Sequence, residues 1–257
     1  MAVSKKQKNS SNWAILVILA IFLAALFWFF FIQRTSTSKR SIRYTAFGIA
    51  IPSDYSLHGI DVSRYQSQID WAAVSRMRVD SIQLDFCFIK ATEGKKYTDP
   101  FFKTNWKQIT KTSLIRGAYH YYNPNEDGSA QAAHFIDQVD LRIGDLPPVL
   151  DIEILGAASP KKLVIGVRQW LDRVEAHYGV KPILYSGVQF YKDYLAKHFA
   201  AYPLWIAHYY QPSLPRTSHA WMFWQHSDRG RVNGIESEVD FNVFKGTRAA
   251  FDSLRIR

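Results

Sequence analysis

Hydrophobic residues near the N-terminus form one long uninterrupted run. Residues 13–32 are twenty consecutive apolar residues without a charge. A helix of that length spans about 30 Å, which is the thickness of the hydrocarbon core of a bilayer. A cleavable signal peptide has a shorter apolar core followed by small residues, whereas Phe-Phe-Phe-Ile-Gln-Arg stands here. The pattern therefore predicts a transmembrane signal anchor over 13–32, preceded by a basic tail over 1–12.

A second pattern begins after the anchor. Residues 33–56 are rich in Ser, Thr and basic residues and lack sustained periodicity, which is typical of a linker. Over 57–257, short apolar or alternating runs alternate with helix-like stretches, and this part is predicted to be one folded domain. The runs predict eight strands, over 57–62, 84–91, 115–122, 148–154, 182–186, 203–208, 221–226 and 238–241.

Helical patterns follow each of the first five predicted strands. They cover 69–78, 100–112, 129–139, 160–178 and 188–196. The fourth begins with Ser159 and Pro160 as N-cap and first helical residue, and it ends at Gly179. Alternating strands and helices indicate a parallel α/β sheet, and eight strands favour a closed, TIM-like barrel. The last three strands have too little sequence between them for full helices, so we expect an irregular C-terminal side.

Charge and cysteine content exclude several classes of function. The net charge is +10, but residues 1–56 hold seven basic residues and one acid, while the remainder holds 25 basic residues and 21 acids. The folded domain is therefore ordinary in charge, and without a helix-turn-helix, zinc-finger or basic-zipper pattern we expect no nucleic-acid partner. The single cysteine, Cys87, excludes an intrachain disulfide, and its apolar neighbours indicate a buried structural thiol.

Metal and cofactor signals are missing from the sequence. The eight His are dispersed, and no His-x-x-x-His or His-x-His pair has acidic support. Neither a Gly-rich phosphate loop nor a Gly-x-Ser-x-Gly elbow is present. We therefore expect no metal and no cofactor. Aromatic residues make up 15% of the chain, with eight Trp, which suits a large core and equally suits a site that stacks on sugar rings.

In a barrel of this type, polar residues at the C-terminal ends of the strands form the active site. One set of side chains fits that rule, strand by strand. Its members are Asp61, Glu93, His120, Tyr121, Asp151, Glu153, Tyr185, Trp205, His208, Gln225 and Asp240.

Asp151 and Glu153 carry the strongest chemical signal. Side chains at i and i+2 of a strand point to the same face, about 6 to 7 Å apart at their Cα atoms. Two carboxylates in one dry cavity raise the pKa of one of them, which makes that group a general acid near neutral pH. The alternative is a solvated strand end or a salt-bridged pair, but the flanking Pro-Pro-Val-Leu and Ile-Leu indicate a buried strand.

The remaining candidates have structural alternatives. Asp61 and Asp240 could cap loops, and His120 could be a core histidine with satisfied hydrogen bonds. The aromatic residues could simply fill the barrel. Their joint placement at one rim favours a role in binding, and the binding candidates are Glu93, Tyr119, His120, Tyr121, Tyr185, Trp205 and Gln225.

Eight segments together resemble glycoside hydrolase family 25, the lysozymes or muramidases, in the order that the family shows. The resemblance covers residues 57 to 246 and each segment alone is weak. The segments are HGIDVSRYQ with IDW, FIKATEG, RGAYHY, LDIE, PILYS, LWIA, FWQHS and VDFN.

The resemblance implies a (β/α)5(β)3 barrel and cleavage of the β-1,4 bond between N-acetylmuramic acid and N-acetylglucosamine. It also implies that Glu153 is the proton donor, Asp151 its partner, and Asp61 and Asp240 further acids of the site. The Asp-x-Glu pair is similar to that of enzymes in which the acetamido group of the substrate attacks, so Asp151 is expected to orient that group.

Two other functions stay open from the sequence. One is a barrel that binds peptidoglycan without cutting it, and the other is a hydrolase of another N-acetylated glycan such as chitin. If peptidoglycan strands are the substrate, the domain must lie outside the cytoplasm of a bacterial cell. We then expect a single-pass membrane protein with its N-terminus inside, acting as a monomer.

Overall fold

The computed structural model describes residues 10–35, 41–210, 217 and 219–257, with side chains of the first helix described over 16–28. The chain divides into two compact units, Met1–Lys39 and Arg40–Arg257, and each is considered by itself.

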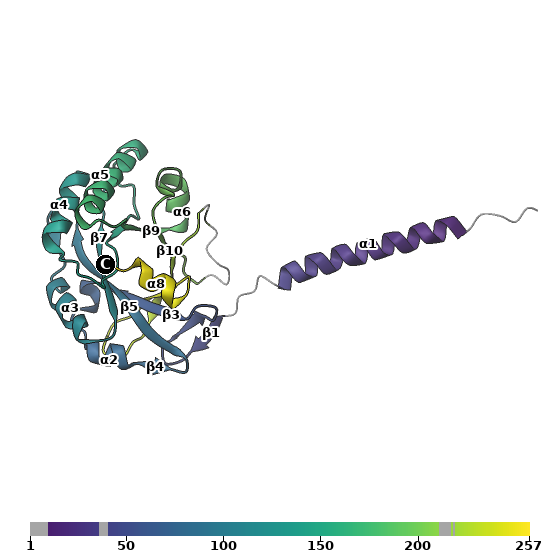
Figure 1. Ribbon diagram of the computed structural model, residues 1–257, viewed down its shortest axis with the longest axis horizontal. Coiled ribbons are helices and arrows are strands. Elements are labelled where there is room, and N and C mark those ends of the chain that lie inside the picture. Colours follow the sequence, from purple (N-terminus) through teal and green to yellow (C-terminus); the bar gives the residue numbers. More distant parts are fainter. Residues whose placement is uncertain (1–9, 36–40, 211–216, 218) are drawn as a thin grey trace, which may run out of the picture. The chain divides into compact units, whose positions relative to one another are not determined.

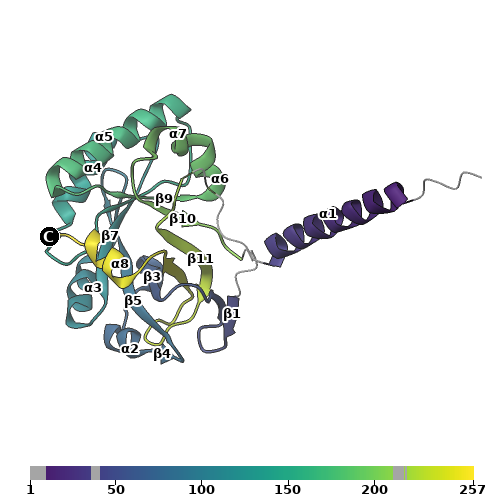
Figure 2. The same ribbon diagram turned by 45° about the vertical axis from the view of Figure 1, so that its right-hand side comes forward.

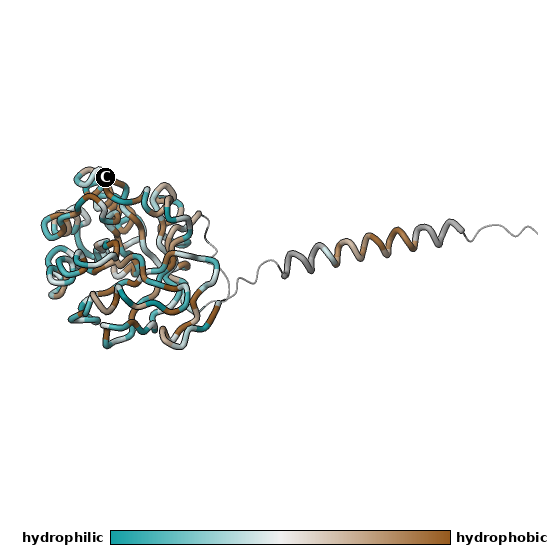
Figure 3. The backbone as a smooth tube through the Cα atoms, turned by 60° about the horizontal axis from the view of Figure 1, so that its bottom comes forward, coloured by the Kyte–Doolittle hydropathy of each residue, from teal (hydrophilic) through white to brown (hydrophobic). Residues whose placement is uncertain are grey.

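The first unit contains one helix, α1 (Ser10–Thr35). Its described side chains are exposed, and Figure 3 shows that this middle part of α1 is strongly hydrophobic. The prediction of a helix over 13–32 is confirmed. Among the described residues, however, none of the helices combines the length and the apolar character needed to cross a bilayer, so the membrane-spanning part of that prediction is not confirmed. Most of the predicted basic tail, residues 1–9, lies outside the described residues.

The second unit opens with an antiparallel hairpin of β1 (Ser41–Tyr44) and β2 (Ile49–Pro52). Phe47, in its turn, is fully buried, and its ring lies 5.3 Å from the ring of Phe241, centroid to centroid. Within the linker predicted over 33–56, residues 41–52 therefore form an ordered hairpin that belongs to the second unit. Two strands of four residues each are too short to show sustained periodicity in the sequence.

Eight strands close into a barrel, and each matches one of the predicted strands (Figures 1 and 2). Neighbouring strands are parallel from β3 through to β11, whereas the last strand, β12, runs antiparallel between β11 and β3. The eight are β3 (Leu57–Val62), β5 (Ile82–Glu93), β7 (Ile115–Tyr121), β8 (Val149–Asp151), β9 (Ile183–Gly187), β10 (Leu204–Ala207), β11 (Phe223–Gly230) and β12 (Val239–Phe244). Two short strands, β4 (Arg78–Val79) and β6 (Tyr97–Thr98), pair with β5.

Helical segments follow each of the first five barrel strands, as predicted. Ser159 caps α5 through its side chain, which accepts from the backbone N–H of Lys162, and Gly179 ends that helix in the left-handed conformation. The helices α4 and α5 lie side by side (Figure 1). The segments are α2 (Trp71–Arg76), α3 (Phe102–Gln108), α4 (Gly128–Gln138), α5 (Pro160–Tyr178), and α6 (Val188–Phe190) continued by a π-helical turn and α7 (Ala196–Phe199).

Aromatic rings fill the interior of the barrel and leave room for no extra carbon at two strand positions. A Cβ atom added at Gly59 would stand 2.4 Å from the ring of Phe86, and one added at Gly117 would stand 2.5 Å from the ring of Phe88. Real Cβ atoms do not approach so closely, so only glycine lets these rings occupy the interior. The barrel interior is therefore a packed core below the carboxyl ends of its parallel strands.

A final helix that the sequence pattern did not reveal, α8 (Arg248–Leu254), closes the opposite end. Its residue Phe251 is fully buried, with ring centroids 5.4 Å from Phe86 and 5.2 Å from Phe244. Phe86 and Phe244 both lie at the end of the barrel where the parallel strands begin.

We expect Phe251→Ala to lower the free energy of unfolding by about 3–5 kcal/mol, because it leaves a cavity among aromatic rings. Urea denaturation of the full chain measures this loss. Ser253→Ala, at a solvent-facing position of the same helix, serves as the control and should change stability by no more than about 0.5 kcal/mol. Equal effects of the two substitutions would show that α8 does not plug the barrel.

Candidate active site

A pocket of about 200 Å³ opens at the carboxyl ends of the barrel strands. It brings together all four predicted acids and most of the predicted binding residues, although they come from strands far apart in the sequence. The pocket is lined by Asp61, Ser63, Tyr65, Lys90, Tyr119, Tyr121, Asp151, Glu153, Tyr185, Trp205, Tyr209, Gln225 and Asp240.

Asp61 and Asp240 form one acidic pair, where β3 and β12 face each other in register. The Oδ2 atom of the buried Asp61 accepts hydrogen bonds from Nε2 of Gln225 (2.8 Å) and Nδ2 of Asn242 (2.7 Å). Burial raises the pKa of both carboxyl groups, and they are hydrogen-bonded to each other. The two amide donors favour the ionised form of Asp61, so the shared proton resides on Asp240.

Asp151 and Glu153 form the second acidic pair. β8 ends at Asp151, but the backbone N–H of Ile152 still donates to the carbonyl of Tyr185 (3.0 Å), and Oγ of Ser186 donates to the carbonyl of Ile152 (2.7 Å). These bonds keep the chain extended, so both acidic side chains reach the pocket.

The environments of these two acids differ. Asp151 is buried, whereas Glu153 is exposed at the mouth of the pocket. Burial, reinforced by the neighbouring Glu153, raises the pKa of Asp151 well above its usual value. Glu153 keeps contact with solvent, but the protein atoms around its carboxyl group displace part of the hydration and raise its pKa too. Both shifts favour the protonated form of this pair. The Oδ1 atom of Asp151 has no hydrogen-bond partner among the described residues, although it is buried.

Gln225 connects the two acidic pairs. While its Nε2 atom donates to Asp61, its Oε1 atom accepts from the hydroxyl groups of Tyr185 (2.5 Å) and Tyr209 (2.6 Å). The nearby hydroxyl group of Tyr185 also lowers the pKa of Glu153. Gln225 and Tyr185 thus stand between the two acidic pairs.

Lys90 is the only cation among the residues that line this pocket, and the sequence analysis missed it. Its Nζ atom lies 2.7 Å from Oε2 of Glu93 and 4.7 Å from the centre of the Tyr121 ring. Its charge lowers the pKa of both Asp151 and Glu153, against the effect of burial. Strand alternation was a usable signal, because Lys90 follows the interior residues Phe86 and Phe88 at intervals of two.

Two predicted binding residues lie elsewhere. His120 is fully buried outside the barrel, with Nδ1 2.7 Å from Oγ1 of Thr92 and Nε2 3.1 Å from Oε1 of Gln131. Alternation along β7 turns it away from the pocket, because its neighbours point inward, so the core-histidine alternative is the right one. Glu93 does not line the pocket and instead forms an ion pair with Lys90.

The floor and the rim of the pocket are aromatic. Trp205 is only 2% exposed, stacks on Phe88 at 4.5 Å between ring centroids, and donates from Nε1 to Oδ1 of Asn242 (2.8 Å). Tyr65, at the rim, is 72% exposed. Tyr65 lies in a single 3₁₀ turn (Arg64–Gln66) and Tyr209 in a turn after β10. Segments this short have no periodicity that indicates which way a side chain points.

No group of three or more His, Cys, Asp or Glu side chains within the described ranges is arranged to hold a metal ion. Cys87, the only cysteine of the sequence, is buried, and burial raises the pKa of its thiol.

The sequence and the fold of this chain are similar to those of known glycosyl hydrolases. Residues 60–235 match the sequence profile of the glycosyl hydrolases family 25. YegX, an uncharacterised protein of Escherichia coli K12, is 53% identical over 202 residues, which are 79% of this chain and 74% of YegX. Lysozyme M1 of Streptomyces globisporus is 35% identical, over 79% of this chain and 73% of that protein. A family 25 glycosyl hydrolase structure from Bacillus anthracis superposes with a TM-score of 0.74 and 30% identity, covering 83% of this chain and all of that one.

We expect Lys90→Met to raise the pKa of both Asp151 and Glu153, because the substitution removes the cation that favours their ionised forms. Titration of the ¹³C-labelled carboxyl groups by NMR measures the midpoints. Lys90→Arg keeps the charge and should leave the midpoints near those of the wild type. Unchanged midpoints in Lys90→Met would show that Lys90 does not act on this pair.

Proposed function

Because the chain belongs to glycosyl hydrolase family 25 and is a glycoside hydrolase, we propose that it is a lysozyme-type enzyme of peptidoglycan. The bond cleaved is the β-1,4 linkage between N-acetylmuramic acid and N-acetylglucosamine. The observation that carries this proposal is that Asp151 and Glu153, at the end of β8, line the same pocket. Cleavage of a glycosidic bond needs a proton donor beside a second carboxyl group, and this pair supplies both.

Glu153 is the proton donor in this proposal. It stands at the open mouth of the pocket, where the leaving oxygen of a glycan strand can reach it. Its raised pKa favours the protonated form that can donate, and the nearby Tyr185 hydroxyl group favours the carboxylate that remains after the proton has left.

Asp151 orients the acetamido group of the substrate. Its Oδ1 atom is a buried acceptor without a partner, so an amide N–H of the substrate would satisfy it. That hydrogen bond favours ionised Asp151 and leaves the shared proton on Glu153. The acetamido oxygen then attacks the anomeric carbon as Glu153 protonates the leaving oxygen, and water later opens the resulting ring with Glu153 as base.

Asp61 and Asp240 complete the charge balance of the site. Asp61, held by two amide donors, supplies a fixed negative charge, whereas Asp240 holds a proton. A fixed carboxylate near the reacting sugar stabilises the positive charge that develops at the anomeric carbon. Both acidic pairs come from one chain, and the proposed active unit is a monomer.

We expect Glu153→Gln to lower kcat on purified sacculi roughly 10²- to 10⁴-fold, because the amide cannot donate the proton. Muropeptide analysis of the digest measures turnover, and a matching thermal unfolding curve shows that the fold is intact. Asp172→Asn, the same kind of acid-to-amide change at an exposed position of α5 outside the pocket, provides the control and should keep wild-type kcat on the same sacculi.

Four outcomes would each contradict a part of the proposal. Wild-type turnover by Glu153→Gln would remove Glu153 from the mechanism. Cleavage of chitin oligomers in preference to sacculi would change the substrate, and cleavage of neither would leave a binding protein. Proton NMR of the first product tests the attacking group, because the acetamido scheme retains the anomeric configuration and an inverted first product excludes it.

We also propose that the domain acts outside the cytoplasm of a bacterial cell, because its proposed substrate lies there. The apolar run in the sequence supports a membrane anchor over residues 13–32. The full chain should then remain with the membrane fraction after washing with salt and at high pH, whereas a chain starting at residue 40 should not. Recovery of the full chain in the soluble fraction would exclude the anchor.

A further inference from the structure

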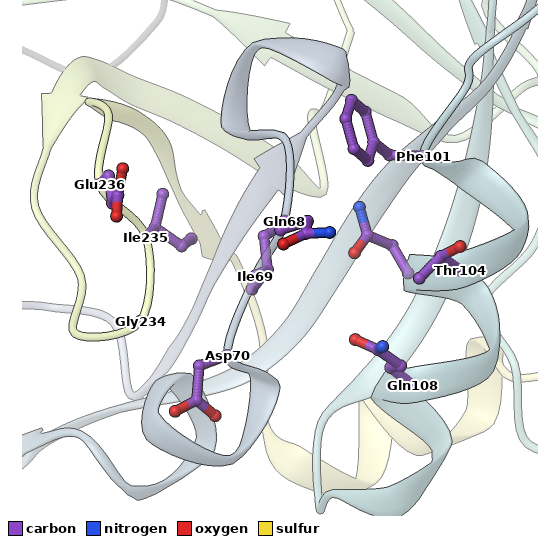
Figure 4. Close-up of a pocket in the computed structure, with 10 residues that line it drawn as sticks. Gln68, Ile69, Asp70, Phe101, Thr104, Gln108, Gly234, Ile235 and Glu236 are labelled. Atoms are coloured by element: carbon purple, nitrogen blue, oxygen red, sulfur yellow. The ribbon is translucent and has the colours of Figure 1, made fainter.

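A second cavity lies at the same end of the barrel as the catalytic pocket. Its volume is about 570 Å³, against about 200 Å³ for the catalytic pocket, and it is within the size range of ligand sites. Residues 68–70 after β3, the face of α3 and residues 234–236 before β12 line it. Figure 4 shows α3 as one wall, the connection from β11 to β12 as the other, and Gln68 between them. We call this cavity the α3 trench.

The α3 trench and the catalytic pocket are neighbours. The connection from β3 to α2 contributes Tyr65 to the catalytic pocket and Gln68 to the trench. Three residues of extended chain span at most about 11 Å, so the two sites lie within reach of one polymer strand. The ring of Tyr65, which is 72% exposed, stands on the segment that separates them.

Hydrogen bonds hold the walls of the trench in place without a ligand. The backbone N–H of Asp70 donates to the carbonyl of Gly234 (3.0 Å), and Nε2 of Gln66 donates to the carbonyl of Glu238 (2.9 Å). Gly234 has a φ of +91°, and a Cβ atom there would stand 2.5 Å from the carbonyl oxygen of Asp70. A cavity whose walls are fixed in advance costs little conformational entropy to occupy.

The chemistry of the lining is that of uncharged amide and hydroxyl groups. The side chains of Gln68, Thr104 and Gln108 are exposed and make no hydrogen bond within the described part of the chain. They offer both donors and acceptors to a ligand. The lining contains no basic residue, while Asp70 and Glu236 carry carboxylates that disfavour an anion. Phe101 adds a partly exposed ring against which the apolar face of a sugar can pack.

We propose that the α3 trench binds neutral N-acetylated sugar units of the same glycan strand whose bond is cut in the catalytic pocket. This inference rests on the proposed function and deepens it. The trench holds a part of the strand that takes no part in the reaction, so it contributes affinity for long strands and leaves the chemical step unchanged.

The triple variant Gln68→Ala, Thr104→Ala and Gln108→Ala in the full chain tests the proposal. The substrates are long glycan strands stripped of their peptides and short fragments that fill only the catalytic pocket. We expect KM for the long strands to rise roughly five- to thirtyfold, as for the loss of one or two ordinary hydrogen bonds, with kcat and the turnover of short fragments unchanged. Lys107→Ala, on the same helix but outside the trench, is the control.

Two results would overturn the proposal: an unchanged KM for long strands, or an equal loss on long and short substrates. If the triple variant does not fold, Thr104→Trp replaces it, because a large ring at this exposed helix position fills the trench. Co-sedimentation of the full chain with long strands gives a readout independent of catalysis. Equal binding by wild type and variant would exclude the trench as a binding site. This readout does not depend on cleavage, so failure of the trench can be told apart from failure of the proposed function.

Discussion

The antiparallel pairing of β12 with β3 is the constraint on which the rest of the structure depends. It closes the barrel, and its register sets Asp240 opposite Asp61. Once these strands are in place, Asn242 can donate to Asp61 from the same strand as Asp240, and Gln225 can donate from β11. A buried Asp61 and a half-buried Asp240 thereby lie side by side, and the hydrogen bonds to Asp61 compensate for its lost hydration. The charge distribution of the pocket follows from one pairing of distant segments.

The two ends of the barrel interior serve different purposes. Towards the N-terminal ends of the strands, rings of Phe86, Phe88 and Phe251 fill the space, and two strand glycines make room for them. Towards the carboxyl ends, acids, amides and tyrosines replace these rings. The dry, rigid floor keeps water from screening the acids from below, so their mutual repulsion and the charge of Lys90 act at full strength. Packing at one end therefore makes the proton sharing at the other end possible.

Catalysis and strand binding are separated on this surface in our proposals. The catalytic pocket is small and acidic, with a single cation, whereas the α3 trench is larger and lined mainly by uncharged groups. Both are built from the connection that follows β3, which carries Tyr65 and Gln68. A strand that lies in the trench is thereby aligned with the acids at the mouth of the pocket, and its binding energy is independent of the protonation of those acids.

Local pattern in the sequence determined the eight strands, the helices between them and the acids at the strand ends. Period-two and period-3.6 hydrophobicity are properties of contiguous residues, and the spacing of Asp151 and Glu153 is one of them. The hairpin over 41–52 and α8 were missed because short elements are stabilised by what they cover, as Phe47 and Phe251 are by distant rings. Only the tertiary structure decided that Lys90 faces the acids, that His120 turns away and that Asp61 meets Asp240. These facts depend on which strands become neighbours when the barrel closes, and contacts between residues so far apart in the chain leave no local pattern.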